Sequence, residues 1–496
     1  MRTSHKIILG LCLLPGLSGR MQAQNADDAF RYSFTGITGT SRFTSMGGAF
    51  GALGGDASIA SYNPAGIGVY RRSELTFTPS FFYQNVTSNF KNQVAEDFKY
   101  NFNIGNFGYV GKIDHYNTTG EGWISSSFGI TYNRINNFHS NVLIEGRNSQ
   151  SSLLDVWYNQ AARINGKQNP SNLDPFGAGL AWETYLLDTI PTDTVNNLPW
   201  EYYSQISSPN MGNLQRKAMN MTGSMAETAI SYAGNYSNKL FIGATIGFPT
   251  IRFRYNSIHT EEVNSQDTNS VLKSFNYRED LYTRGNGFNF KVGVIYRLND
   301  YVRLGGALHT PTFYSLSDSW SSRISANYNN GSTLQFDSPN GSFNYSLNTP
   351  MRAIGSVAFV IAQKGLISAD YEFVDYSNMR LRSNTYKFFD ENDDIRRSYS
   401  AAGILRVGAE YRAEPFALRA GYANWANAYR PNVANNSSRN DFSFGIGIRE
   451  KEYYIDFAYL ISVSNSQYYI YDPGFVSAAK LNTTNNHFMV TIGFRY

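Results

Sequence analysis

The sequence predicts an all-β protein, a transmembrane antiparallel β-barrel of about 14 strands. Apolar and polar residues alternate along most of the chain, aromatic residues are frequent, and long apolar runs are missing from its body. Aromatic residues make up 15% and charged residues 16% of the 496 residues, whereas about 25% of a soluble domain is charged. No apolar run in the body of the chain approaches the roughly 20 residues of a membrane helix. Only alternate residues of a barrel strand face lipid, so this composition suits a barrel.

The alternation is clearest in the last segment of the chain. Phe488, Val490 and Ile492 fall on one face of a strand, and Met489 and Thr491 fall on the other. Glycine and charged residues occupy the second face in many segments, as expected of a polar lumen. Alternating segments of this kind cover 74–87, 100–113, 122–146, 223–236, 238–262, 271–298, 300–328, 341–363, 365–383, 400–414, 416–427, 440–451, 453–470 and 482–496. Their number is even, as is usual for single-chain bacterial barrels.

The connections between these segments are short and long in alternation. Tight connections such as Ser237-Asn238 and Asn299-Asp300 follow even-numbered strands, whereas longer ones, including 88–99 and 147–222, follow odd-numbered strands. Outer-membrane barrels have short periplasmic turns and long outer loops. This asymmetry predicts that the C-terminus and the start of the segment preceding the barrel lie on the periplasmic side of the outer membrane. We also expect the protein to be a monomer.

Residues 1–24 have the features of a signal peptide. Arg2 and Lys6 precede an apolar core, and Ala23-Gln24 offers a cleavage point. The single cysteine, Cys12, lies in that core. The mature chain is therefore expected to hold no disulfide and no cysteine-ligated metal.

Residues 25–73 are expected to form a compact plug, or hatch, inside the barrel of residues 74–496. The stretch from Arg42 to Gly66 is dense in small residues, and glycine permits backbone conformations and close approaches that other residues do not. A flexible linker is the alternative, but apolar residues recur too regularly there for a solvated tether. The residues expected to form the hatch and its gate are Met46, Gly47, Gly48, Asn63, Pro64, Ala65 and Gly66.

The long connection at 147–222 has a different pattern. Ser151 and Ser152 precede apolar residues at helical spacing that extend to Ile164, and Asp174-Pro175 gives a second helix start. Two amphipathic helices in an outer loop could pack on the barrel rim, or they could offer an apolar landing site for a ligand. The candidate ligand contacts are Leu153, Leu154, Trp157, Phe176, Leu180, Trp182 and Tyr185.

Charged and catalytic motifs give little further signal. Inward-facing charges such as Arg406, Glu410 and Arg419 could bind a carboxylate headgroup, or they could simply pair with one another in the lumen. Residues 390–394 begin like a calcium loop, but Ile395 occupies the glycine position, so an acidic outer loop is expected. No nucleophile, phosphate-loop or histidine metal motif occurs, and we expect neither enzymatic activity nor a metal or other cofactor. The net charge of +4 is too small to indicate nucleic-acid binding.

Three short motifs carry a family resemblance: Met46-Gly47-Gly48-Ala49, Gly54-Gly55-Asp56-Ala57 and Asn63-Pro64-Ala65-Gly66. They resemble the N-terminal hatch of the FadL-like long-chain fatty-acid transporters of bacterial outer membranes. The resemblance implies a fourteen-stranded barrel closed by its own N-terminal segment. It further implies capture of hydrophobic small molecules from outside, amid outer-membrane lipid and lipopolysaccharide, and their passage past the hatch to a gap in the barrel wall. Asn63-Pro64-Ala65 would be the moving element, or else a rigid turn that closes the hatch.

Two other functions remain open from the sequence. A FadL-like barrel could act as an accessory in protein secretion, in which case its outer loops would bind a protein partner. It could also be a receptor for haem or an aromatic compound, although no tyrosine–histidine pair indicates a haem ligand set. Transport predicts an apolar route from the outer loops to a gap beside the hatch, whereas partner binding predicts a blocked lumen and an exposed apolar rim.

Overall fold

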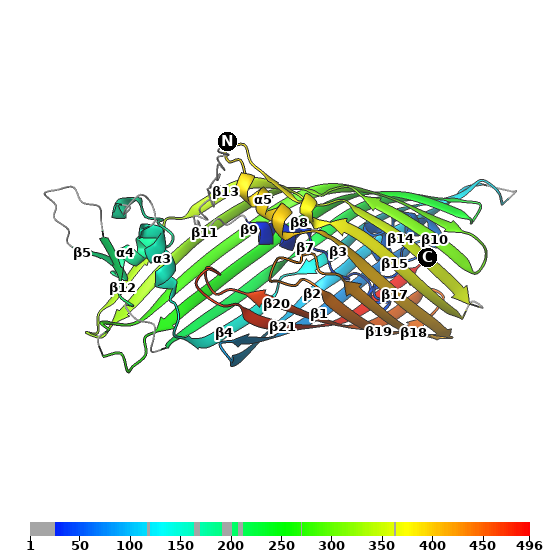
Figure 1. The fold of residues 1–496 in the computed structure, drawn as a ribbon. Coiled ribbons are helices and arrows are strands. Elements are labelled where there is room, and N and C mark those ends of the chain that lie inside the picture. Colours follow the sequence, from blue (N-terminus) through cyan, green and yellow to red (C-terminus); the bar gives the residue numbers. More distant parts are fainter. Residues whose placement is uncertain are drawn as a thin grey trace, which may run out of the picture.

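The computed structural model describes residues 25–116, 120–162, 169–190, 201–206, 212–268, 270–361 and 364–496. The predicted signal peptide lies outside the described residues, as does Ile164. The chain forms a closed antiparallel barrel of 14 wall strands, since β21 (Ala479–Arg495) pairs with β1 (Glu74–Phe90). The strands run obliquely to the long axis of the barrel (Figure 1). The predicted fold class is confirmed.

Ten wall strands are single elements, and four consist of two elements separated by a break. The single ones are β1, β2 (Gln93–Asp114), β7 (Asn213–Tyr236), β8 (Leu240–Glu262), β9 (Leu272–Arg297), β17 (Ala401–Ala413), β18 (Phe416–Trp425), β19 (Arg439–Arg449), β20 (Tyr453–Tyr468) and β21. The divided ones are β3 (Trp123–Asn137) with β4 (Ser140–Asn148), β10 (Val302–His309) with β11 (Phe313–Tyr328), β13 (Gly341–Asn348) with β14 (Arg352–Ile361), and β15 (Gly365–Asp375) with β16 (Arg380–Arg382). A short strand, β12 (Thr333–Asp337), pairs with β11 in the connection to β13.

The strands present apolar side chains outward, as the alternation predicts. On β19, Phe442, Phe444 and Ile446 are exposed, whereas Asp441 and Ser443 are buried. The outer surface is therefore an apolar band, and the polar residues point inward. No helix among the described residues is long and apolar enough to cross a bilayer.

The tight connections gather at one end of the barrel, called here the turn end, and the C-terminus lies there (Figure 1). The opposite end, the loop end, carries the longer connections. One predicted loop, 88–99, is wrong, because β1 and β2 continue to a two-residue turn at Lys91 and Asn92. Both turn residues have positive φ, 50° and 64°, and such turns match the twist of a hairpin.

The insertion at the loop end, residues 149–212, is shorter than the predicted 147–222 because β4 and β7 extend into that range. The first predicted helix is α3 (Leu153–Ala162). The second, α4 (Ala178–Glu183), does not begin at Asp174-Pro175. Those residues form a turn in which Gly177 N–H and Gly179 N–H donate to Asp174 O. The insertion also contains η3 (Pro170–Asn172) and a small sheet of β5 (Leu187–Ile190) and β6 (Glu201–Ser204), which the sequence did not predict.

The predicted acidic loop at 390–394 is wrong, because these residues lie in a helix, α5 (Phe389–Ser398). Carboxylates in its first turn and arginines in its last turn suit the helix dipole. Asp393 also pairs with Arg396 at 2.8 Å and with Arg397 at 2.5 Å, one turn away. A short helix, η6 (Tyr376–Asn378), precedes it between β15 and β16.

Residues 25–73, called here the inner segment, lie within the barrel. Its helices are α1 (Ala26–Ser33), α2 (Ser41–Ser45), η1 (Ala57–Ser61) and η2 (Pro64–Val69). Each one begins at a side-chain cap, supplied by Asn25, Thr40, Asp56 and Asn63. Residues 40–54 are all buried. The inner segment therefore forms much of the core of the barrel.

Candidate functional site

The inner segment is hydrogen-bonded to strands on several sides of the wall. Ser41 N–H donates to Thr491 Oγ1 of β21 at 2.7 Å, and Gly51 N–H donates to Asp370 Oδ2 of β15 at 2.8 Å. On β8, Thr245 Oγ1 donates to Ala60 O at 2.9 Å. Buried backbone groups of an irregular segment need such partners. The wall therefore satisfies the polar groups of this segment in place of water.

Inward-facing glycines of the wall make room for the inner segment. An added Cβ at Gly293 would lie 1.9 Å from Asn63 Oδ1, and one at Gly243 would lie 2.5 Å from Pro64 C. The same close approach recurs between wall and segment at Gly305, Gly408, Gly421 and Gly445. Glycine was expected on the inner face because the lumen is polar. At these positions it is the close packing of the inner segment against the wall backbone that requires glycine.

Glycines within the segment turn the chain tightly. Gly47, Gly48, Gly54 and Gly55 all have positive φ, between 63° and 73°, which other residues adopt only with strain. Immediately before the first of these turns, Met46 is completely buried. These positions explain why the stretch is rich in glycine.

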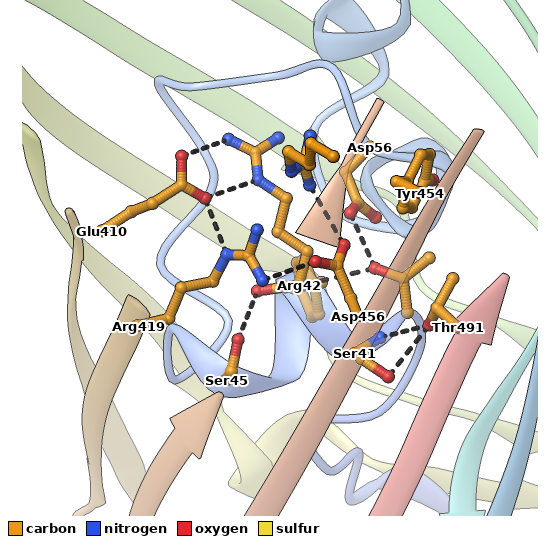
Figure 2. A network of polar contacts seen from close by, with 12 residues as sticks. Ser41, Arg42, Ser45, Asp56, Glu410, Arg419, Tyr454, Asp456 and Thr491 are labelled. Carbon is orange, nitrogen blue, oxygen red and sulfur yellow. Dashed lines mark hydrogen bonds and ion pairs between the residues drawn. The ribbon is translucent and has the colours of Figure 1, made fainter. Parts of the chain in front are cut away.

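A buried ionic network fixes the inner segment near the turn end (Figure 2). Arg42 Nε donates to Glu410 Oε2 at 2.8 Å, and Arg419 donates to Glu410 and to Asp456, each at 2.7 Å. Asp56 accepts a hydrogen bond from Thr40 Oγ1 at 2.6 Å. Removing one partner from a buried pair leaves an uncompensated charge, at a cost of about 3–5 kcal/mol. These inward-facing charges therefore pair with one another, which is the second of the two interpretations that the sequence left open.

The Asn63-Pro64-Ala65 turn connects the inner segment to itself and to the wall. Asn63 Oδ1 accepts from Ala65 N–H at 3.2 Å, and Asn63 Nδ2 donates to Gly51 O at 2.6 Å and to Val294 O at 3.3 Å. Asn63, Pro64, Ala65 and Gly66 are all buried. One side chain thus holds the turn, an earlier part of the segment and strand β9 together. Whether this turn moves remains a prediction.

The wall has a seam between β2 and the kinked strand β3–β4. Pairing of β2 with β3 covers only Asn106–Asp114 against Ser125–Asn133. Residues 93–105 of β2 have no ladder partner on that side among the described residues. Side chains bridge the seam instead, as Asn141 Nδ2 donates to Phe98 O at 3.0 Å. The seam is therefore held less firmly than the paired wall around it.

The inner segment covers this seam from within. Gly36 N–H donates to Ile135 O at 2.9 Å, and Asn136 Nδ2 donates to Phe34 O at 3.3 Å. Pairing of β3 with β7 slips between Arg134 and Asn136, so Ile135 is left out of the ladder and bonds to the segment. Phe34, Thr35 and Gly36 are only half-buried, whereas residues 39–54 are all buried. The segment is thus more accessible beside the seam than along 39–54.

A cavity of about 100 Å³ lies between the inner segment and the wall beside the seam. Ile37, Phe43 and Tyr62 of the segment line it, together with charged groups of the wall that include Lys291 and Arg352. Ligand pockets usually measure about 300–1,000 Å³. This cavity is too small for a long apolar ligand unless the segment shifts. No cluster of three or more potential metal ligands occurs in the described part of the chain.

The insertion packs against the inner face of the barrel at the loop end. Leu153, Leu154, Trp157 and Leu180 are buried in a cluster with Phe275, Tyr277 and Ile324 of the wall. The N–H of Leu153 donates to the buried Glu261 Oε1 of β8 at 2.7 Å. Burial raises the pKa of Asp155 in α3. These candidate contacts therefore belong to the joint between insertion and barrel.

The other three candidate ligand contacts, Trp182, Phe176 and Tyr185, are buried to different extents. Trp182 packs on the edge of the cluster, with its ring 6.0 Å from that of Tyr202. Phe176 is half-buried, and its carbonyl accepts a hydrogen bond from Tyr277 Oη at 2.9 Å. Tyr185 is 58% exposed. The helical spacing correctly indicated an apolar face, but it could not show whether that face binds a ligand or the protein itself.

Substitution in the insertion separates these roles. We expect Trp157→Ala to destabilise the insertion by about 3–5 kcal/mol, because a buried indole leaves a cavity. Tyr185→Ala should change stability by less than about 0.5 kcal/mol, since the ring is exposed. Limited proteolysis in detergent compares the stability of the insertion in each variant with that in the wild type. Equal protease resistance of Trp157→Ala and wild type would contradict the packing described here.

The fold has known counterparts among solved structures. The toluene transporter TodX of Pseudomonas putida aligns with a TM-score of 0.54 at 12% identity, over 94% of this chain and 99% of that one. A Pseudomonas aeruginosa FadL homologue aligns with a TM-score of 0.54 at 13% identity, over 93% and 99% of the two chains. No protein-family model and no curated protein sequence matches the chain.

These likenesses define the class of fold. The chain has the fourteen-stranded barrel fold of TodX and of the FadL homologue along nearly its whole length. The resemblance drawn from the hatch motifs is confirmed at the level of the fold.

Proposed function

We propose that this protein is an outer-membrane channel that takes up hydrophobic small molecules, such as long-chain fatty acids or related apolar compounds. The inner segment acts as its hatch. The observation that carries the proposal is the seam between β2 and β3–β4, where backbone pairing stops at Asn106 and the hatch forms the inner cover. The solved structures with this fold carry transporter and FadL names, which supports the same class of function.

The route we propose leads sideways into the membrane. An apolar molecule gains about 0.8 kcal/mol for each methylene sheltered from water. The ionic network of Arg42, Glu410, Arg419 and Asp456 joins the hatch to the wall near the turn end, and such a network offers an apolar molecule no favourable surface. At the seam, by contrast, a small shift of residues 34–38 would open the cavity toward the bilayer. In this arrangement the turn end and the C-terminus face the periplasm, the loop end faces outward, and the protein acts as a monomer.

The filled mouth of the barrel supports a second candidate function. The insertion cluster contacts β1, β4, β7, β9 and β11, so a ligand entering from the loop end must displace part of it. If the insertion does not move, the loop end is instead a surface for a protein partner, as in the secretion-accessory alternative. Ligand-dependent protection of the insertion from protease supports transport, and a partner retained without any ligand uptake supports the alternative.

Uptake by cells tests the proposal directly. We expect a deletion strain to lose uptake of a labelled apolar compound, and the wild-type protein to restore it. Asn63→Ala/Pro64→Ala should reduce that uptake, because the double variant loses the links to Gly51 and Val294 and the fixed proline φ. The barrel should stay heat-resistant on gels, because its wall ladders are untouched. Unaltered uptake would mean that the turn is purely structural. Absence of any apolar ligand from lipid extracts, together with unchanged uptake in the deletion strain, would refute transport itself.

A further inference from the structure

A groove on the outside of the barrel lies far from the seam, between the wall and the connection that leads to α5. It has a volume of about 1540 Å³. Phe248, Phe288 and Phe313, from β8, β9 and the start of β11, line one side. Residues of β13, β16 and α5 line the other. The groove is larger than a usual small-ligand pocket of about 300–1,000 Å³.

The groove lies where the apolar outer surface ends. Along β9, outward side chains from Tyr296 to Phe288 are apolar and exposed, and the next outward residues, Asn286 and Arg284, are polar. The stretch Phe288–Tyr296 is about as long as a tilted strand needs to cross the hydrocarbon core. The three phenylalanines therefore lie at the edge of the hydrocarbon, and the rest of the groove lies at headgroup level.

The groove is positively charged. Arg380, Arg382, Lys387 and Arg396 line it, and none of its lining residues carries a carboxylate. Arg380 donates to the backbone carbonyls of Ser377 and Met379. Arg396 pairs with Asp393, which also pairs with Arg397. Arg380, Arg382 and Lys387 form no ion pair with any described residue, and positive charge that is not compensated in this way suits an anionic ligand.

Polar side chains complete the surroundings. Asn344 and Ser346 of β13 lie along the same groove, and both are exposed. Amide and hydroxyl donors beside guanidinium groups match the several oxygens of a phosphate, and arginine favours such oxyanions. A single carboxylate would use only part of this set.

We propose that this groove binds the phosphorylated headgroup of a lipid A-type lipid in the leaflet at the loop end, with an acyl chain against Phe248, Phe288 and Phe313. The inference rests on the proposed outer-membrane location and orientation, because that leaflet is then the outer one. It does not depend on any substrate passing through the barrel. The lipid would support the wall at two breaks. Thr310–Thr312 divides the wall strand β10–β11, and Thr349–Met351 divides the neighbouring wall strand β13–β14.

Native mass spectrometry of the detergent-purified mature protein tests the site, with lipid A, phosphatidylglycerol and oleate as separate probes. We expect lipid A to bind the wild type, and Arg380→Gln/Arg382→Gln/Lys387→Gln to reduce the bound fraction at least about fivefold, a loss of roughly 1 kcal/mol. The matched control Arg252→Gln/Arg254→Gln/Lys273→Gln removes the same charge from exposed positions outside the groove and should bind as wild type.

A second variant tests the groove independently, so that the result does not depend on the folding of the triple variant. Ser346→Trp adds an indole at an exposed wall position inside the groove and should also block lipid A. Equal lipid A binding by groove variants and control would overturn the inference, as would preferential binding of oleate by the wild type. Uptake assays on the same variants keep the two proposals apart. Loss of lipid A binding with uptake retained supports the lipid site alone, and lipid A binding by a wild type without uptake refutes only the transport function.

Discussion

A disulfide between cysteines placed at Gly36 and Ile135 is expected to abolish uptake of apolar compounds. The backbone N–H of Gly36 lies 2.9 Å from Ile135 O, so the two residues are adjacent, as a disulfide requires. The bond would fix the hatch to the kinked part of β3 and prevent the shift that opens the seam. Uptake under oxidising conditions should fall to the level of the deletion strain, and a reductant should restore it.

The sequence and the packing at Gly36 favour this disulfide experiment. Its one cysteine, Cys12, lies in the predicted signal peptide, so the introduced pair should be the only thiols in the mature protein. An added Cβ at Gly36 meets nothing closer than 3.8 Å. Each single-cysteine variant, and the reduced double variant, should therefore transport normally. Full uptake by the oxidised double variant would show that the hatch does not need to leave this part of the wall.

Gly293→Ala should displace the Asn63 turn from the wall. The new Cβ would lie 1.9 Å from Asn63 Oδ1, so the side chain must move and its bonds to Ala65 N–H and Val294 O are strained or lost. Overpacking of a close contact costs about 1–3 kcal/mol, and unsatisfied buried polar groups add about 1–3 kcal/mol. We expect a lower unfolding temperature of the barrel in detergent and a loosened hatch, detected as faster hydrogen exchange in residues 57–69.

Gly129→Ala is the matched control. Gly129 is also a buried wall glycine, on β3, but its added Cβ would meet Ile67 Cδ1 only at 3.7 Å, an ordinary contact. Its unfolding temperature and hydrogen exchange should stay close to those of the wild type. If both alanine variants behaved alike, the close packing of wall glycines against the hatch would not be what holds the Asn63 turn.

Much of the fold was predictable from the sequence because a strand repeats with a period of two. Alternation along 440–451 and 482–496 specified which side chains face outward, and the tight connections at Ser237-Asn238 and Asn299-Asp300 were placed correctly. The apolar spacing after Ser152 likewise predicted α3. The full length of the β1–β2 hairpin was missed because charged residues interrupt this stretch. Val94, Phe98 and Phe102 nevertheless continue the outward face of the strand through it. The helix α5 was missed because its carboxylates, once a calcium loop was ruled out, were assigned to an acidic loop, although their place in the first turn was a signal for a helix N-terminus.

The candidate site was only partly visible in this way. Small residues indicated that 42–66 must pack closely against something, and the resemblance singled out Asn63-Pro64-Ala65. The insertion residues were correctly identified as apolar, but four of them form the joint with the barrel and are not open to a ligand. The seam at Asn106 and the outer groove beside Arg380 went unnoticed, since neither has a motif.

The sequence by itself determined the barrel, the inward and outward faces of its strands, and a glycine-rich segment able to fit inside. Only the tertiary structure decided that Gly293 lies against Asn63, that Arg42 binds Glu410, and that pairing between β2 and β3 stops at Asn106. The physical reason is that alternation specifies the face to which a side chain points. It does not specify which residue of another strand or segment, hundreds of positions away, will lie opposite.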